Sequence, residues 1–417
     1  MNEILLWIAV GFGFYMAWNI GANDVANAMG TSVGSRALTF MRAIIYAAIF
    51  EFLGALLVGS HVTDTVRKGI IDASTFEGSK ETFVLGMTAA LLGAAAWLNI
   101  TSAFGQPEST THSIVGAIFG FGLIVGGTEA VNWGVIAKIA ISWVSAPLFG
   151  GLIGYFLFRF ISRRILAVES PSRAVQRIAP LLLFAVASIL ALSMLWKGLK
   201  NLKLDYSLPE ALGLAALAGI VVALVGSLLL RRIHRVRVKD GLEEELWYVE
   251  SIFRRLQVVT ACYVAFAHGA NDVANAVGPL AAVATVVKTG ALPTGANPVP
   301  TWILLLGAVG IVVGLATFGR RVMETVGRKI TEMTPSRGFT AEFAAATTVL
   351  ICSRMGVPVS TTHTLVGAVI GVALARGIAA LNMRVVRVIA TTWVVTIPVA
   401  ASFTLVFYFI LKGLFLH

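Results

Sequence analysis

Apolar runs long enough to cross a lipid bilayer recur throughout this chain of 417 residues. They cover, approximately, residues 4–29, 40–59, 84–104, 134–158, 178–196, 211–230, 258–287, 301–318 and 387–412. A transmembrane helix needs about 20 apolar residues, so each run is a candidate span. Only 13% of the residues are charged, compared with about 25% in a soluble domain. The sequence therefore predicts an all-α polytopic membrane protein.

An eight-residue string of small and polar residues, Gly-Ala-Asn-Asp-Val-Ala-Asn-Ala, occurs twice, at residues 21–28 and 269–276. A second pair of related strings follows at similar spacing. Pro-Glu-Ser-Thr-Thr-His-Ser stands at residues 107–113, and Pro-Val-Ser-Thr-Thr-His-Thr stands at residues 358–364. The chain is therefore predicted to consist of two related halves that carry the same pair of polar strings.

Basic residues are concentrated between apolar runs, in the segments 159–177, 231–255 and 320–337. Because Lys and Arg are enriched in cytoplasmic loops, we place these segments in the cytoplasm. Counted from these loops, the octapeptide at 21–28 lies on a span going inward and its copy at 269–276 on a span going outward. The halves are thus predicted to be two inverted-topology repeats, an architecture typical of secondary transporters.

Each Ser-Thr-Thr triad follows a Gly-x-Pro that breaks the preceding helix, and a short apolar run follows it. Such a segment predicts a re-entrant hairpin with hydroxyls at its tip. We expect about 10 spans plus two re-entrant hairpins, about 12 membrane segments in all. Residues 1–230 would form the first repeat with additional spanning helices, 231–257 a cytoplasmic amphipathic linker, and 258–417 the second repeat.

The two triads are candidate anion-binding groups. Hydroxyls beside the free N–H groups of a helix N-terminus bind an oxyanion without Arg or Lys. The alternative is that they only cap a helix, and their duplication beside a helix break favours binding. The candidate ligands are Ser109, Thr110, Thr111, Ser360, Thr361 and Thr362.

The two octapeptides are candidate cation sites. Carboxylate and amide oxygens are hard ligands suited to a small cation such as Na⁺, and an intramembrane aspartate marks a pathway or has a partner. The alternative is that Asp24 and Asp272 only join helices through hydrogen bonds. The candidate cation ligands are Asn23, Asp24, Asn27, Asn271, Asp272 and Asn275.

Six further residues are second-tier candidates. His112 and His363 would hold the anion or orient the hairpins, Glu51 and Glu342 would bind a cation or link helices, and Gly21 and Gly269 would allow close backbone approach or local unwinding.

Several other classes of function are disfavoured. The net charge of +11 does not indicate a nucleic-acid partner, because the basic residues lie in loops between spans. The spacing of Cys262 and Cys352 predicts neither a disulfide framework nor a metal site. No cleavable signal peptide is expected, because the start, Met1-Asn2-Glu3, lacks a basic region.

At these doubled strings the chain resembles the inorganic phosphate transporter (PiT) family, and residues 50–55 and 338–343 fit the family pattern as well. The resemblance covers both halves, and the short linker indicates a prokaryotic-type member. It implies symport of inorganic phosphate with Na⁺ or H⁺ across the plasma (inner) membrane, with no cofactor or enzymatic activity, by a homodimer in the lipid bilayer. The triads would contact phosphate, and Asn23, Asp24, Asn271 and Asp272 would serve the cation. Glu108 departs from the apolar residue expected there.

Na⁺ is favoured over H⁺ as the coupling ion, because amide ligands do not titrate. Three alternatives stay open: a transporter of another tetrahedral oxyanion such as sulfate, a membrane-embedded enzyme that uses the aspartates and histidines, and a passive anion channel. Equal duplication of every polar motif suits a two-sided carrier better than an asymmetric active site. The acidic residues argue against a channel.

Overall fold

The computed structural model describes residues 3–59, 63, 66, 69–195, 206–233, 242–293, 299–328, 331–377, 379 and 381–416. Among these residues, nine helices are long and apolar enough to cross a membrane, compared with about ten predicted spans. They are α1 (Glu3–Gly34), α2 (Phe40–Val58), α4 (Lys80–Ala103), α6 (Trp133–Ile161, extended by η4, Ser162–Leu166), α7 (Pro171–Leu195), α8 (Leu208–Ile233), α9 (Leu242–Thr289), α10 (Thr301–Phe318) and α14 (Met383–Phe415). The prediction of an all-α polytopic membrane protein is confirmed.

Two helix pairs reverse direction where the Gly-x-Pro motifs stand. The shorter helices are α5 (Thr110–Phe121, extended by η2, Gly122–Gly126), α11 (Arg320–Arg328), α12 (Pro335–Arg354) and α13 (Thr361–Leu374), together with the 3₁₀ turns η1 (Ala73–Phe76) and η3 (Thr128–Ala130). Gly105 ends the α4 segment with φ 67°, and Gly356 ends the α12 segment with φ 69°. These are left-handed conformations that glycine adopts without steric cost. With 12 and 14 residues, α5 and α13 are about 18 and 21 Å long, too short to span a bilayer of about 30 Å.

The two halves interlock through these short helices. Helix α5 packs against α14 and α13 packs against α6, so each short helix lies on a long helix of the other half. Gly116 of α5 abuts the backbone of Ile397, and Gly367 of α13 abuts the backbone of Pro147. A side chain at either glycine would overlap that backbone, which explains why these contacts are built from small residues.

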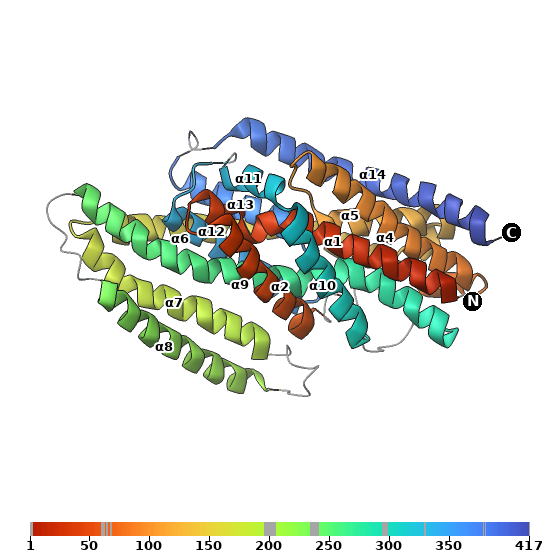
Figure 1. Cartoon of the computed structure of the whole chain (residues 1–417), viewed down its shortest axis with the longest axis horizontal. Coiled ribbons are helices and arrows are strands. Elements are labelled where there is room, and N and C mark those ends of the chain that lie inside the picture. The colour runs from red at the N-terminus through yellow and green to blue at the C-terminus, as the bar shows by residue number, and fades with distance from the viewer. Residues whose placement is uncertain are drawn as a thin grey trace.

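The octapeptide helices run in opposite directions. In Figure 1, α1 runs from the N-terminus at the right toward the left, whereas α9 runs from left to right. A Cβ atom at Gly21 would overlap the carbonyl oxygen of Ile311, and one at Gly269 would overlap that of Glu51. Both glycines lie inside continuous helix. They allow another helix to approach closely, and the backbone is not unwound at either of them. Gly21 and Gly269 are equivalent positions of the repeated octapeptide, so the residues that they contact, Ile311 and Glu51, are equivalent positions as well.

The described part of the predicted amphipathic linker, residues 242–257, is the beginning of α9. That helix is continuous from Leu242 to Thr289 over 48 residues. In this segment Val249, Ile252 and Phe253 are buried in the protein, whereas Leu242 and Trp247 are exposed. Residues 234–241 of the predicted linker lie outside the described part of the chain.

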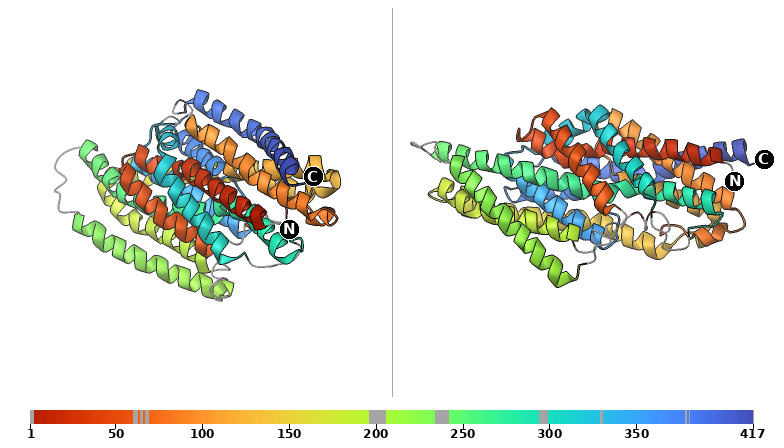
Figure 2. Two further views of the ribbon diagram at one scale, coloured as in Figure 1. Left: turned by 45° about the vertical axis from the view of Figure 1, so that its right-hand side comes forward. Right: turned by 60° about the horizontal axis from the view of Figure 1, so that its bottom comes forward.

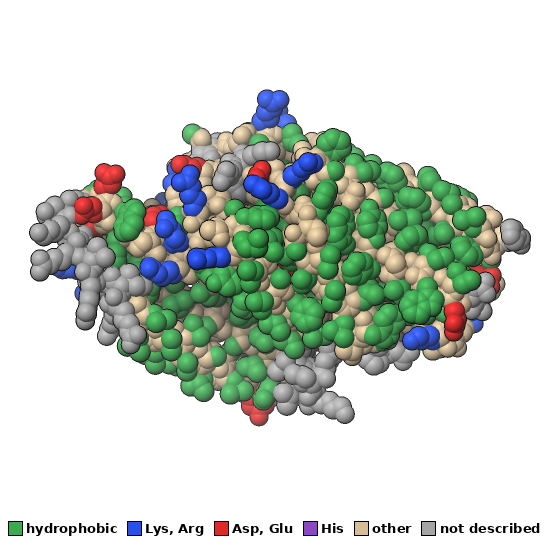
Figure 3. All heavy atoms as spheres, viewed as in Figure 1, with side chains coloured by type: hydrophobic (Ala, Val, Ile, Leu, Met, Phe, Trp, Pro, Cys, Tyr) green, Lys and Arg blue, Asp and Glu red, His purple; other side chains and the backbone are tan. Residues whose placement is uncertain are grey.

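The exterior has the character of a membrane protein. Helices α7 and α8 pack together at the edge of the bundle in every view (Figures 1 and 2). Figure 3 shows hydrophobic side chains over the middle of the molecule, with Lys and Arg gathered toward one end. Arg36, Arg42, Arg254 and Arg320 line one groove of about 540 Å³. These basic residues from both halves thus lie together, as expected of loops on the same side of a membrane.

Candidate functional site

The four polar strings meet inside the protein. Helix α1 packs against α9, and the N-termini of α5 and α13 reach both. Twelve candidate ligands therefore share one region, and all of them are at most 5% exposed: Asn23, Asp24, Asn27, Ser109, Thr110, Thr111, Asn271, Asp272, Asn275, Ser360, Thr361 and Thr362. Neither the triads nor the octapeptides form a site alone.

The first octapeptide is bonded to the second triad. The Asn27 side-chain amide donates to Thr362 Oγ1 over 2.7 Å and to Asp24 Oδ1 over 2.7 Å. The Thr362 hydroxyl lies 3.2 Å from Asp24 Oδ1 and 2.8 Å from the carbonyl oxygen of Glu108. Thr362 thus joins an aspartate of the first half to the tip of the second hairpin.

The second octapeptide is bonded to the first triad in the same manner. The Asn275 amide lies 3.3 Å from the hydroxyls of both Thr110 and Thr111. The Thr111 hydroxyl lies 3.2 Å from Asp272 Oδ1 and 3.2 Å from the carbonyl oxygen of Val359. Asp272 Oδ2 also accepts a bond from Thr361 over 2.8 Å. Each aspartate is therefore bonded to a threonine from the other half.

Asn23 and Asn271 hold the hairpin of their own half. The Asn23 amide donates to Ser102 Oγ over 2.8 Å, and Asn23 Oδ1 accepts the Glu108 N–H over 2.9 Å. The Asn271 amide donates to the Val359 carbonyl over 2.8 Å, and its Oδ1 accepts from Ser353 over 3.2 Å. These two asparagines fix the hairpin tips against the octapeptide helices.

The serines of the triads serve as helix caps. Ser109 Oγ accepts the His112 N–H over 3.1 Å, and Ser360 Oγ accepts the His363 N–H over 3.1 Å. Each serine stands at the N-cap position with extended backbone. The serine hydroxyls thus cap α5 and α13, as the alternative to anion binding predicted. The threonine hydroxyls instead contact the octapeptides. The first N–H groups of α5 and α13 lack partners within their helices and give this region a positive potential.

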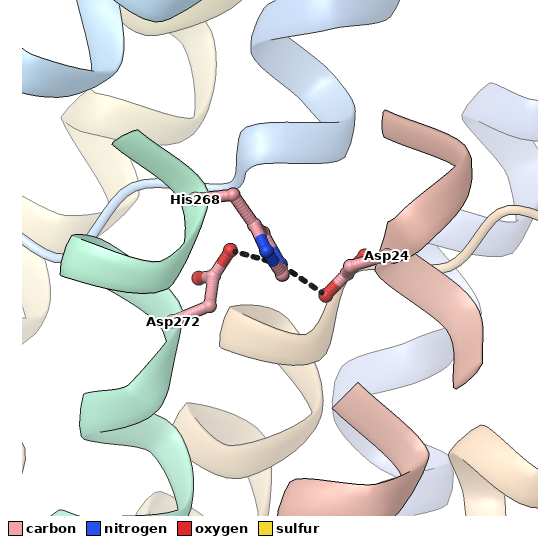
Figure 4. Close-up of side chains that lie close together, drawn as sticks. All are labelled: Asp24, His268 and Asp272. Atoms are coloured by element: carbon pink, nitrogen blue, oxygen red, sulfur yellow. Dashed lines mark ion pairs between the residues drawn. The ribbon is translucent and has the colours of Figure 1, made fainter. Parts of the chain in front are cut away.

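His268 is the site residue that sequence reasoning missed. Its Nε2 lies 3.5 Å from Asp24 Oδ2 and 3.2 Å from Asp272 Oδ2, and the imidazole sits between the two aspartates in Figure 4. Its Nδ1 lies 3.3 Å from Glu51 Oε2. His268 directly precedes the second octapeptide, but Ile20 precedes the first, so the doubled motif does not reveal it. The usable signal was its position one helical turn before Asp272.

The two second-tier glutamates lie in different environments. Glu51 is fully buried in contact with His268, which places it at the edge of the site. The carboxylate of Glu342 instead accepts four hydrogen bonds from neutral donors, at 2.6–3.0 Å. The four donors are Thr31, Ser32, Gln257 and Thr260. Glu342 links α1, α9 and α12. Of the two roles considered for it, binding a cation or linking helices, these contacts fit the second.

The histidines that follow the triads form an aromatic stack. The ring centroids of His112 and His363 are 4.2 Å apart. Trp143 lies 4.1 Å from His112 on one side, and Trp393 lies 3.5 Å from His363 on the other. The stack joins α5 to α13 and both to the long helices α6 and α14, so these rings orient the hairpins.

The oxygens left without hydrogen-bond partners indicate where a cation fits. Among the described residues, Asp24 Oδ2 and Asn27 Oδ1 are buried and accept no hydrogen bond, while Asp24 Oδ2 lies 3.5 Å from His268 Nε2. The ligand atoms of Asp24, His268 and Asp272 lie within 4.8 Å of one another. Free carboxylate and amide oxygens suit a hard monovalent cation, and the donor set contains no thiolate. The site therefore offers N–H and O–H donors to an anion and free oxygens to a cation.

Comparisons with known proteins agree on one family. A family model described as the phosphate transporter family matches residues 20–404. A putative phosphate permease of Pyrococcus abyssi is 48% identical over 407 residues, which are 97% of this chain and 98% of that protein. Inorganic phosphate transporter 2-1, chloroplastic, of Arabidopsis thaliana is 43% identical over 435 residues, covering 98% of this chain and 72% of that protein. A solved structure described as the sodium-dependent phosphate transporter is 41% identical, with a TM-score of 0.89 over 98% of this chain and 99% of that one.

Proposed function

The chain belongs to the phosphate transporter family, and from this premise we propose that it is a secondary active transporter that moves inorganic phosphate together with Na⁺ by alternating access. It is a transporter and not an enzyme. Its membrane helices make it a multi-pass membrane protein. We further propose that it works in the plasma (inner) membrane as a homodimer, as the family resemblance implies.

The observation that carries the proposal is the crossed bonding between the halves. Thr362 bonds to Asp24, and Thr111 bonds to Asp272. An anion bound by the hydroxyls of Thr362 and Thr111 therefore lies next to Asp24 and Asp272, which are the proposed cation ligands. Opening the site to either side of the membrane breaks one set of these contacts, so occupancy by both substrates favours the closed arrangement. Two inverted repeats supply the two opposite openings.

The charges of the site require a cation to accompany the anion. Asp24, Asp272 and Glu51 surround His268, and no Lys or Arg side chain in the described residues bonds to them. Phosphate adds negative charge to a region that already holds several buried carboxylates. Burying an unpaired charge is costly, so phosphate binding depends on cations that enter with it. The sodium dependence of the related solved transporter supports Na⁺ in this role.

Phosphate fits the mixed donor and acceptor character of the site better than sulfate does. Near neutral pH phosphate carries at least one O–H group, which can donate to a buried carboxylate, whereas sulfate carries none. A site that has such an acceptor rejects a ligand without the matching donor, because its own polar group is then left unpaired. Sulfate is therefore the competitor against which phosphate is tested.

Binding of labelled phosphate to the purified protein tests the proposal. We expect binding in Na⁺ that is lost in choline, and that a tenfold excess of sulfate leaves nearly unchanged. Thr362→Val or Thr111→Val removes a hydroxyl that donates to the anion and is expected to weaken binding about ten- to one-hundredfold, since a hydrogen bond to a charged group contributes about 1.5–3 kcal/mol.

Thr88→Val is the matched control, because this buried threonine donates to Val84 of its own helix. Equal competition by sulfate would show that the transported anion is a different oxyanion. Equal binding in choline would contradict the coupling to Na⁺.

A further inference from the structure

Glu108 breaks the two-fold relation between the hairpins. It stands directly before the first triad, at the tip between α4 and α5, where the second hairpin has Val359. Both residues are 0% exposed. A carboxylate in this position is therefore a specific addition to one half of the site.

The contacts of Glu108 occupy only one of its carboxylate oxygens. Oε1 accepts the N–H of Ser109 over 2.8 Å and the hydroxyl of Thr396 over 2.5 Å. Oε2 is buried and accepts no hydrogen bond from the part of the chain that the structure describes. In the backbone, the Glu108 N–H donates to Asn23 Oδ1 and its carbonyl accepts from Thr362. Glu108 thus lies between the octapeptide of its own half and the triad of the other.

The Ser109 N–H belongs to the start of α5, which would otherwise serve an external anion. Glu108 places its own carboxylate on this donor. Val359 has no acceptor with which to do the same at α13. The start of α5 is thus partly neutralised from within the chain, and the start of α13 is the more available anion-binding end.

Glu108 also adds to an unbalanced set of buried charges. The Thr362 hydroxyl that bonds to the Glu108 carbonyl also bonds to Asp24, and Asp24 is close to His268. His268 already lies against Asp24, Asp272 and Glu51. One imidazole cannot balance four buried carboxylates, and a buried carboxylate without a compensating charge is strongly disfavoured.

We propose that Glu108 is the carboxylate ligand of an additional Na⁺ at the tip of the first hairpin, with Oε2 as the ligating atom. This inference rests on the proposed symport of phosphate with Na⁺. The two hairpins then differ in one respect: the tip with Glu108 binds a cation beside its threonine hydroxyls, whereas the tip with Val359 supplies hydroxyl donors to the anion alone. The second half has no equivalent ion.

The proposal is tested by counting Na⁺ in two ways. The first is the number of labelled Na⁺ ions bound per purified protein at saturation with phosphate. The second is the number of Na⁺ ions coupled to each phosphate, from the phosphate gradient that a set Na⁺ gradient sustains in proteoliposomes at zero net flux. Glu108→Gln keeps an oxygen for Ser109 and Thr396 but removes the charge, and Glu108→Val reproduces the residue of the second hairpin.

Both variants are expected to lose about one Na⁺ in each count, and Glu108→Asp is expected to retain it. An unchanged count in Glu108→Gln would overturn the proposal and leave Glu108 as a cap of α5. If Glu108→Val does not fold, Glu108→Gln decides. The wild-type protein in the same vesicles separates the two inferences: absence of sodium-driven uptake there contradicts the proposed function, whereas an unchanged count in an active variant contradicts only the role of Glu108.

Discussion

Replacing His268 with glutamine is expected to reduce the free energy of unfolding by about 3–5 kcal/mol, the usual cost of removing one partner from a buried ion pair. The imidazole lies 3.2 Å from Asp272, 3.5 Å from Asp24 and 3.3 Å from Glu51. Its loss leaves three buried carboxylates beside one another without the group that separates them. Thermal unfolding of the purified protein in detergent, followed by tryptophan fluorescence or by aggregation, measures the change.

A second substitution distinguishes charge from packing as the cause. Glu51→Gln in the His268→Gln background removes one of the orphaned charges, so the double variant is expected to be more stable than His268→Gln alone. The counterpart positions in the other half, Ile20 and Ile311, are buried and apolar, which shows that this place in the fold does not require polar groups. A His268→Gln protein within about 0.5 kcal/mol of the wild type would show that His268 does not balance these charges.

Replacing Asp272 with asparagine is expected to abolish concentrative phosphate uptake at low Na⁺. Asparagine keeps an oxygen for Asn271, Asn275 and Thr111, which bond to Oδ1, so the fold is retained. The negative charge that attracts the cation is lost. Losing a charge-assisted contact of about 1.5–3 kcal/mol lowers the affinity for Na⁺ about ten- to one-hundredfold. Asp24→Asn is expected to behave likewise.

The Na⁺ concentration that gives half-maximal phosphate uptake is the quantity to measure. Asp72→Asn is the control, because Asp72 is exposed and, among the described residues, its carboxylate bonds only to Ser74. Its half-maximal Na⁺ concentration is expected to stay the same. Normal uptake with unchanged Na⁺ dependence in both Asp24→Asn and Asp272→Asn would show that these aspartates only join helices.

The sequence predicted the parts of the site better than their arrangement. Repetition marks Asp24, Asp272 and the two triads, and the Gly-x-Pro breaks predict the two hairpins. Repetition carries no information on which triad meets which octapeptide, because pairing across the halves arises only when α5 packs on α14 and α13 on α6. The crossed bonds could therefore not be predicted.

Repetition also directs attention away from residues that differ between the halves. His268 was overlooked because its counterpart is Ile20, and Glu51 was grouped with Glu342 although their surroundings differ. Glu51 lies against His268, while four neutral donors surround Glu342. The described part of the predicted linker, residues 242–257, continues without a break into α9, and its Val249, Ile252 and Phe253 are buried in the protein.

Uptake of labelled phosphate into proteoliposomes under an inward Na⁺ gradient, an inward H⁺ gradient or no gradient tests the central claim most directly. The account predicts that phosphate accumulates above its external concentration with the Na⁺ gradient, and that accumulation disappears when an ionophore collapses that gradient. Accumulation driven only by H⁺ would contradict sodium coupling and make the aspartates proton carriers. No accumulation under any gradient, by protein shown to be folded in the same vesicles, would contradict symport itself.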